Sequence, residues 1–194
     1  MPHSTVRRFV TGHNALGRSI IVESAQPTVY TLPGVNVVFH ELWSTDAMPI
    51  SVPLHGHEDP AAGPVVLPPP ANGTRFRIID IPPDKDTFRP GDEVRMKEVF
   101  SKIGDADAST ASASARHPAM HRTESVDYAF VIEGEITLLL DEGEAHLKSG
   151  DVVIQRGTNH AWSNRSDQKC RMLFVLMDGK FQPELRAALG SAAH

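Results

Sequence analysis

Two histidines and one aspartate are the residues of this sequence whose types and spacing best suit catalysis or metal binding. The positions of His121, Thr123 and Asp127 differ by two and four, so on an extended segment their side chains share one face. His160 follows 33 residues after Asp127, directly after a turn sequence, and Trp162 shares its parity. We therefore expect two imidazoles and a carboxylate to converge on one cavity.

Two histidines and one carboxylate form the facial ligand set of non-haem Fe(II) oxygenases, and the same ligands hold Zn, Mn or Ni. If a divalent metal binds, the sequence predicts His121, Asp127 and His160 as its ligands, with Thr123 contributing at most through a water molecule. Asp127 has an alternative role as a general base, because burial in an apolar barrel raises the pKa of a carboxyl group. We predict Asp127 and His160 as the catalytic residues in either case.

Substrate contacts are predicted for Thr123, Trp162, Gln155 and Arg156. The Trp162 ring could form a wall against which a planar substrate stacks, or it could pack in the core. Gln155 and Arg156 lie just before a glycine turn, where an arginine could hold a carboxylate through two hydrogen bonds. Solvated turn residues would give the same pattern.

Two further groups carry chemistry with weaker support. Arg75 and Arg77 alternate with apolar residues on an expected strand, so they either line a pocket for an anionic ligand or pair with surface acids, which we favour. His55 and His57 precede Glu58 and form a rival metal motif, but they lie in a proline-rich segment without a strand to fix them.

The first part of the chain alternates short β-forming runs with turn residues, and strands are expected within residues 19–22, 28–32, 35–42 and 75–81. Residues 49–73 hold seven of the fifteen prolines, which indicates an irregular surface excursion, either a lid or a dimer arm. Asp92 is expected to cap a helix that ends at Gly104, followed by a low-complexity loop over 105–115. A short terminal helix is expected over 183–193.

Regular turn signals separate short strand-forming runs between residues 117 and 178, a pattern typical of a β-sandwich or barrel. Within them Leu138 and Leu139 place apolar side chains on opposite faces of one strand. A barrel interior can bury one face. The other needs a second sheet, the N-terminal strands or a partner subunit.

These residues resemble the two sequence motifs of the cupin superfamily. The resemblance covers about residues 120–178, and the matching positions are His121, Asp127, Gly134, Gly157, His160 and Asn164. The chain departs from the usual pattern at several positions. Thr123 replaces the second motif histidine, Asp127 replaces glutamate, Gln155 replaces proline, Ala115 replaces the opening glycine, and Gly150 lies one residue closer to the second motif than usual.

The resemblance implies an all-β, cupin-like double-stranded β-helix, a jelly-roll barrel with an N-terminal strand extension and one or two short helices. One structural domain would comprise N-terminal strands with the proline-rich excursion (1–91), a helix and loop (92–116), the barrel motifs (117–178) and a terminal helix (179–194). The family implies a small-molecule enzyme that depends on a divalent metal, of the dioxygenase, decarboxylase, isomerase or dehydratase type, acting on a small organic acid or a phenolic substrate. The alternative is a metal-free ligand-binding cupin.

Length, composition and charge exclude several other classes of protein. The 194 residues, 40% hydrophobic and 22% charged, suit one globular domain. A net charge of -5 argues against nucleic acid as a partner, and the one cysteine cannot form an internal disulfide. No apolar run is long enough for a membrane span or a secretory signal, so we expect a cytoplasmic protein, and apolar strands on both faces favour a homodimer.

Overall fold

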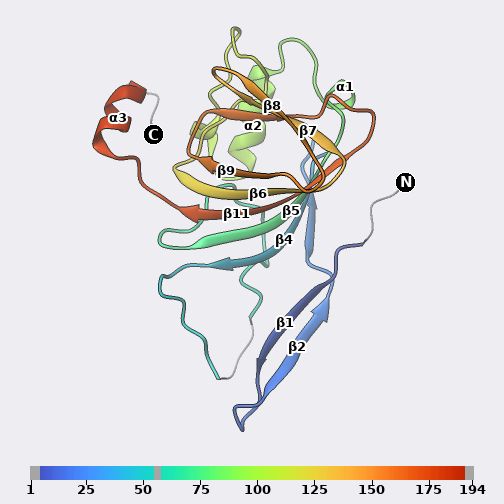
Figure 1. The fold of residues 1–194 in the computed structure, drawn as a ribbon, viewed down its shortest axis with the longest axis vertical. Coiled ribbons are helices and arrows are strands. Elements are labelled where there is room, and N and C mark those ends of the chain that lie inside the picture. The colour runs from blue at the N-terminus through green and yellow to red at the C-terminus, as the bar shows by residue number, and fades with distance from the viewer. Residues whose placement is uncertain (1–4, 55–57, 191–194) are drawn as a thin grey trace.

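The structure, a computed structural model, describes residues 5–54 and 58–190 and consists mainly of antiparallel strands (Figure 1). The strands of these residues are β1 (Arg8–His13), β2 (Ser19–Ala25), β3 (Thr28–Thr31), β4 (Val38–Thr45), β5 (Thr74–Ile81), β6 (Ser125–Glu133), β7 (Glu135–Leu140), β8 (Glu144–Lys148), β9 (Val152–Arg156), β10 (His160–Ser163) and β11 (Cys170–Asp178). The helices are α1 (Asp84–Thr87), α2 (Glu93–Lys102) and α3 (Pro183–Leu189), with one 3₁₀ turn at Ala106–Ala108.

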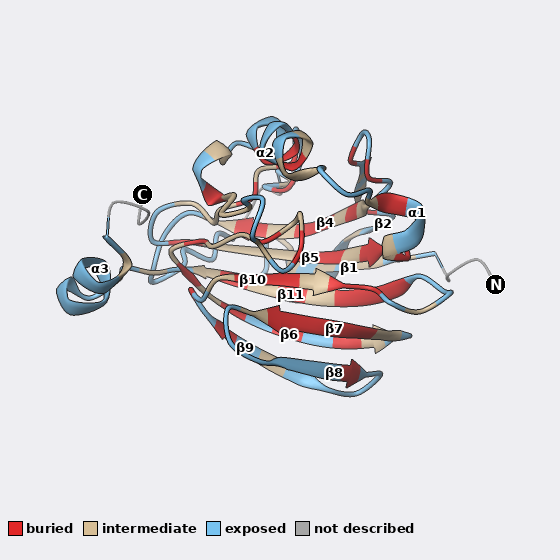
Figure 2. Ribbon diagram, turned by 90° about the horizontal axis from the view of Figure 1, so that it is seen from above, coloured by how far each residue is buried: buried red, intermediate tan, exposed pale blue. Residues whose placement is uncertain are grey.

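Two sheets form the barrel. A six-stranded sheet has the order β3-β4-β5-β11-β6-β9, and a three-stranded sheet has the order β10-β7-β8. Seen from above, buried residues concentrate on the strands of both sheets (Figure 2). Ile136 and Leu138 of the small sheet form one buried cluster with Met172 and Phe174 of the large one. The predicted jelly-roll barrel with an N-terminal strand extension is confirmed.

The N-terminal strands extend the large sheet through β4, which pairs with β5, while β5 pairs with β11. The β1–β2 hairpin extends away from this body (Figure 1). Strand β1 was missing from our expectation because its sequence lacks a continuous apolar run. Arg8 anchors the hairpin, since its guanidinium donates to the Leu42 carbonyl at 3.0 Å and to the Asp59 carboxylate at 2.9 Å.

Helix α2 forms where the apolar spacing predicted it and covers one side of the barrel. Its buried residues Met96, Val99 and Phe100 pack in a cluster with Leu32 and Phe39. Asp92 occupies the N-cap position, but its carboxylate makes no capping hydrogen bond with the helix amides, contrary to expectation. It accepts hydrogen bonds from the Arg95 side chain and the Arg89 backbone N–H instead.

The proline-rich excursion contains no strand or helix in its described residues. Val65 and Leu67 are buried in the same cluster as α2, so the second half of the excursion is part of the body. His55 and His57 lie outside the described residues. Helix α3 forms where expected, although residues 191–194 of the expected range also lie outside the described part.

The second apolar face of β7 is covered by the segment that precedes β6. Leu139 packs with Met120 and Ala161 in a separate buried cluster. A loop therefore covers this face, where we expected a sheet or a partner. In the described part of the chain, no helix combines the length and apolar character that crossing a membrane requires.

Candidate functional site

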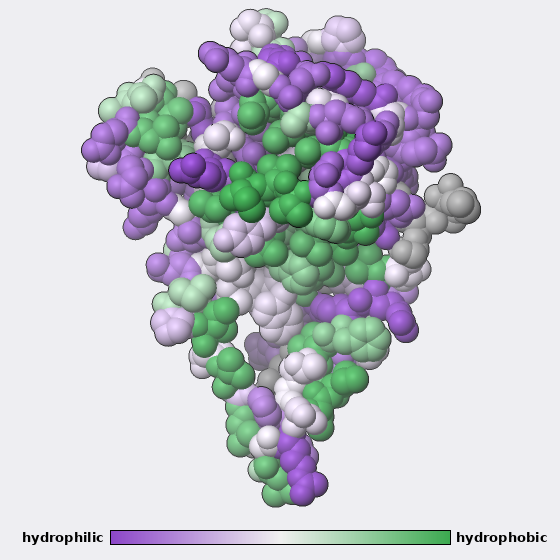
Figure 3. All heavy atoms as spheres, viewed as in Figure 1, coloured by the Kyte–Doolittle hydropathy of each residue, from purple (hydrophilic) through white to green (hydrophobic). Residues whose placement is uncertain are grey.

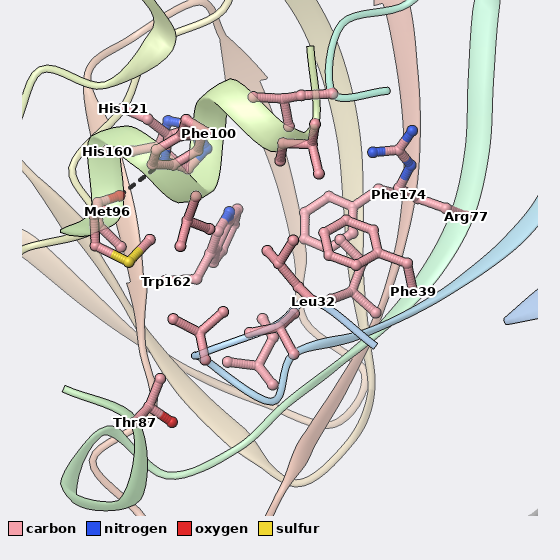
Figure 4. A pocket seen from close by; sticks show the side chains of 18 of the residues that line it. Leu32, Phe39, Arg77, Thr87, Met96, Phe100, His121, His160, Trp162 and Phe174 are labelled. Atoms are coloured by element: carbon pink, nitrogen blue, oxygen red, sulfur yellow. Dashed lines mark hydrogen bonds between the residues drawn. The ribbon is translucent and has the colours of Figure 1, made fainter. Parts of the chain in front are cut away.

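A pocket of about 140 Å³ lies inside the barrel, bounded by the inner face of the large sheet, β10 and α2 (Figure 4). We call it the chamber. Its lining is mostly aliphatic and aromatic. The polar side chains of the lining are Arg77, Thr87, His121, Thr123, Asp127 and His160.

Strand register places Asp127 on the inner face. Asp127 pairs with Leu176 of β11 and with Gln155 of β9, and directly paired residues point to the same side of a sheet. The Asp127 side chain is buried and accepts a hydrogen bond from the Ser125 hydroxyl at 2.7 Å. The Ser125 and Thr123 hydroxyls lie 2.8 Å apart. A row of three polar side chains therefore follows one edge of the chamber.

Burial raises the pKa of Asp127 to about 6, because the apolar lining disfavours its charged form. The Ser125 hydroxyl and the positive charge of Arg77 oppose this rise. A carboxyl group with a pKa near 6 exchanges protons readily near neutral pH, which suits a general acid or base.

His121 and His160 lie side by side although they are far apart in the sequence. Their backbones exchange two hydrogen bonds of 2.8 and 2.9 Å, and their ring centroids are 4.2 Å apart. His121 Nδ1 lies 2.9 Å from the Ala119 carbonyl, and His160 Nδ1 lies 2.9 Å from the Thr158 carbonyl. A carbonyl can only accept, so each Nδ1 donates and each neutral ring carries its lone pair on Nε2.

Both imidazoles are held in the neutral form. Burial lowers the pKa of His160 well below its ordinary value, and the neighbouring His121 adds to the effect. Burial also lowers the pKa of His121. Near neutral pH the pair therefore offers two Nε2 acceptors and no positive charge.

Aromatic rings extend the histidine pair into a wall. The Phe100 ring lies 5.0 Å from His121, the Trp162 ring 5.6 Å from His160, and the Phe174 ring 5.5 Å from Trp162, measured between centroids. The last two contacts are edge-to-face, the arrangement that aromatic rings favour. Trp162 therefore both lines the chamber and packs in the core, so the two roles considered for it coexist.

The structure brings together five of the seven residues predicted for the site: His121, Thr123, Asp127, His160 and Trp162 all line the chamber. Gln155 and Arg156 do not. Gln155 is buried beside Asp127, but its amide donates to the backbone and hydroxyl of Thr158 and so holds the turn before β10. Arg156 has the opposite parity and is exposed on β9. Neither position supports the predicted substrate contact.

The three predicted metal ligands all line the chamber, but they do not form a three-ligand group. Within residues 5–54 and 58–190, no three His, Cys, Asp or Glu side chains gather as a metal site would require. The two histidines offer paired imidazoles, whereas the Asp127 carboxylate is bound to Ser125. The arrangement as it stands does not fit a three-ligand metal centre, and metal binding stays a prediction.

Arg77 is the functional candidate that sequence reasoning placed wrongly. It pairs with buried Glu41 rather than a surface acid, with Nε 3.1 Å from one carboxylate oxygen and Nη2 donating to the other at 3.2 Å. Nη2 also donates to the Val66 carbonyl at 2.7 Å. Ser125 was missed altogether, although it shares the parity of Thr123 and Asp127 and the same alternation could have identified it.

Known proteins of similar sequence support this fold. The family model described as a cupin domain matches residues 110–176. Phomopsin biosynthesis cluster protein C' of Diaporthe leptostromiformis is 34% identical over 182 residues, which cover 91% of this chain and 80% of that protein. The chain belongs to the cupin superfamily.

Other relatives of this cupin are named as enzymes. The cupin-domain-containing oxidoreductase virC of Hypocrea virens is 29% identical over 180 residues, covering 89% of this chain and 76% of that protein. The cupin-domain-containing oxidoreductase fogC of Aspergillus ruber is 30% identical over 182 residues, covering 90% and 73%. The similarity to these proteins supports an enzyme-like cupin.

Proposed function

We propose that this cupin is a small-molecule enzyme whose active site is the chamber and whose acid–base group is Asp127. The observation that carries the proposal is the position of Asp127, a buried carboxyl group that lines an otherwise largely apolar pocket together with two neutral imidazoles. A core residue with a purely structural role would be stable as an apolar side chain or as an ion pair. Here the carboxylate has one hydroxyl partner, and the rest of its surroundings leave it available to a ligand.

The chamber sets the size and character of the substrate. An apolar cavity of roughly 150 Å³ accommodates one benzene ring, so the chamber of about 140 Å³ suits a ring-sized body. The aromatic wall of Trp162 and Phe174 suits a planar molecule. The substrate class we propose is a small organic acid or a phenol.

The residues of the chain have distinct roles in this proposal. Asp127 accepts a proton from the substrate or donates one to it, while the Ser125 hydroxyl fixes the orientation of its carboxylate. The Nε2 atoms of His121 and His160 accept hydrogen bonds from substrate hydroxyl groups. Helix α2 and the aromatic wall exclude water, which strengthens each of these interactions. Such a site suits isomerisation, dehydration or decarboxylation.

The relatives' names extend the possibilities to redox chemistry. A dioxygenase or another oxidoreductase needs an oxidant and commonly a metal. The divalent metal predicted at His121, Asp127 and His160, whether Fe, Mn, Zn or Ni, would require these side chains to come closer together than they lie here, because no three such side chains gather among the described residues. With the side chains as placed, we propose the acid–base role without it.

A test of the proposal uses the full chain and a panel of single-ring phenols and organic acids, incubated with and without added Fe(II), Mn(II) or Zn(II). Products are detected by mass spectrometry. We expect turnover of at least one compound by the wild type and by Asp167→Asn, which alters an exposed carboxylate that pairs with Lys85. Asp127→Asn should show none. Equal turnover by Asp127→Asn would refute the assignment.

A metal-free binding protein is the second candidate, and one observation favours it. Thr123 stands where the family motif has a histidine, and the chamber gathers two imidazoles rather than a larger ligand group. Metal analysis of protein purified without chelator, after growth with Fe, Mn and Zn, tests whether an enzyme at this site depends on a metal, and turnover separates a metal-free enzyme from a binding protein. A stoichiometry near zero removes the metal-dependent form of the enzyme.

A cytoplasmic location stays a prediction from the sequence.

A further inference from the structure

The guanidinium of Arg77 has unused hydrogen-bonding capacity inside the chamber. The side chain is 1% exposed, yet Nη1 has no hydrogen-bond partner among the described residues. Nε lies within ion-pair distance of Glu41 but also lacks a hydrogen bond of acceptable geometry in that part of the chain. Among the described residues, Nη2 alone has hydrogen-bond acceptors, the Val66 carbonyl and the Glu41 carboxylate.

Glu41 does not complete the pair. Its Oε1 atom is buried without a hydrogen bond among the described residues. Both carboxylate oxygens face the Nε and Nη2 edge of the guanidinium, at 3.1 and 3.2 Å, so Glu41 leaves the Nη1 side of Arg77 without an acceptor. Leaving a buried donor unsatisfied destabilises the folded state, and more so when the group is charged. A ligand oxygen that reached Nη1 would recover part of that cost.

Arg77 is placed to meet a ligand. It lines the chamber, and its guanidinium lies 5.5 Å from the Phe39 ring centroid. Figure 4 shows Arg77 on the opposite side of the pocket from His121 and His160, with the aromatic rings between. A molecule that fills the chamber would therefore have one end at the histidines and the other at Arg77.

We propose that Arg77 anchors a carboxylate of the ligand, so that the chamber selects a monocarboxylic acid with an apolar, ring-sized body. A carboxylate rather than a neutral phenol fits because its oxygens would accept charge-assisted hydrogen bonds from Nη1, which Glu41 leaves without an acceptor. The inference rests on the proposed function for the location of the site and narrows its substrate class. Binding alone tests it.

Benzoate is the probe, and benzyl alcohol is the neutral control with the same ring. Calorimetric titration of the full chain should show benzoate binding at least tenfold more tightly than benzyl alcohol, a difference of about 1.4 kcal/mol. Arg77→Gln should abolish the preference. Because that variant leaves Glu41 buried without its cation, the double variant Glu41→Gln with Arg77→Gln is measured beside it, and thermal unfolding checks that each is folded.

The matched control is a second buried ion pair of the same sheet. Arg171 donates to Asp80 at 2.6 and 2.7 Å, and neither residue lines the chamber. The double variant Asp80→Asn with Arg171→Gln should keep the benzoate preference. Equal affinities for the two probes in the wild type, or a preference that survives in the Glu41/Arg77 double variant, would overturn the proposal.

The outcome is separable from that of the proposed function. The benzoate preference of the wild type is measured by binding alone, whether or not the protein turns over any compound. Binding without turnover would count against the enzyme and leave the anchor standing. Turnover of neutral phenols without a preference for benzoate would support the enzyme and refute the Arg77 anchor.

Discussion

Asp127 shows how one side chain can carry a functional assignment. Its pKa of about 6 results from burial, which the Ser125 hydroxyl and the Arg77 charge only partly offset. At neutral pH the folded protein therefore holds a largely ionised carboxylate in an unfavourable environment. A cost of this kind at a pocket wall is typical of functional sites, where local stability is given up for chemistry.

Asp127→Asn should change the pH dependence of stability in a defined direction. Because the pKa is higher in the folded state than the ordinary value of 3.8, the folded state keeps this proton longer than the unfolded chain does. The resulting stabilisation is present below pH 4 and is lost as the pH rises to about 6. Relative to Asp127→Asn, the wild type should lose roughly 2.4 kcal/mol of unfolding free energy between pH 4 and pH 7. Urea unfolding at both pH values measures it, and a constant difference between the proteins would contradict the assigned burial.

His160→Ala distinguishes an enzyme from a binding protein. The ring lies between His121 and Trp162 and offers one of the two Nε2 acceptors. An enzyme should lose turnover, and any bound metal, while staying folded. A binding protein should lose only affinity for its ligand. His146→Ala is the control, because that side chain is 51% exposed and outside the chamber. Loss of turnover in both variants would point to a general effect on the fold.

Sequence parity predicted much of the site at this scale. Alternation along extended segments placed Thr123, Asp127 and Trp162 on the inner face, and the motif spacing brought His160 to His121. Alternation alone could not predict the role of Gln155. Its side chain lies on the inner face, but its amide donates to the Thr158 carbonyl in the turn that follows β9. The role of Arg77 depends on Glu41, 36 residues earlier, and nothing local in the sequence indicates that pairing.

Turns between strands are the elements that sequence specified best. Gly134 joins β6 to β7 at a φ of +84°, and Gly143 lies in the next turn at the same φ. They differ in surroundings. A Cβ on Gly134 would lie 2.9 Å from the Lys169 carbonyl oxygen, whereas a Cβ on Gly143 would meet nothing within 4 Å.

This pair gives a matched test of close packing. Alanine at either position takes on the left-handed backbone penalty, roughly 1–2 kcal/mol. Gly134→Ala must also displace the backbone before β11, so its loss of unfolding free energy should exceed that of Gly143→Ala by roughly 1–3 kcal/mol. Denaturant unfolding measures both. Equal losses of unfolding free energy in the two variants would mean that the Lys169 backbone moves aside without destabilising the fold.

Other elements lay beyond sequence reasoning because their partners are distant. Strand β1 is stabilised by pairing with β2 and by the contacts of Arg8, not by an apolar run of its own. Asp92 precedes α2 as expected, but its carboxylate binds the nearby Arg95 side chain, a local competition that residue types alone do not indicate. The proline-rich excursion is irregular as expected, but the burial of Val65 and Leu67 depends on α2.

At the scale of the whole molecule, the large sheet has an apolar outer face. Tyr128 and Phe130 of β6 pair with Ile154 and Val152 of β9, and all four side chains are exposed. We call these residues the outer patch. Figure 3 shows apolar surface gathered across the middle of the molecule. No described helix covers the outer patch, and an apolar surface of this kind is typical of an interface.

We propose that a second copy of the chain covers the outer patch in a homodimer. The patch is a regular face of two paired strands, and β9 is an edge of the large sheet, so a twofold axis at this edge would bury the same residues of both copies. The wild type should sediment as a dimer at micromolar concentration. Phe130→Glu with Ile154→Glu should sediment as a folded monomer, because two buried charges on each side oppose association. Leu16→Glu, which changes an exposed apolar residue in the β1–β2 turn, should remain a dimer. A monomeric wild type would show that the outer patch meets solvent or another partner.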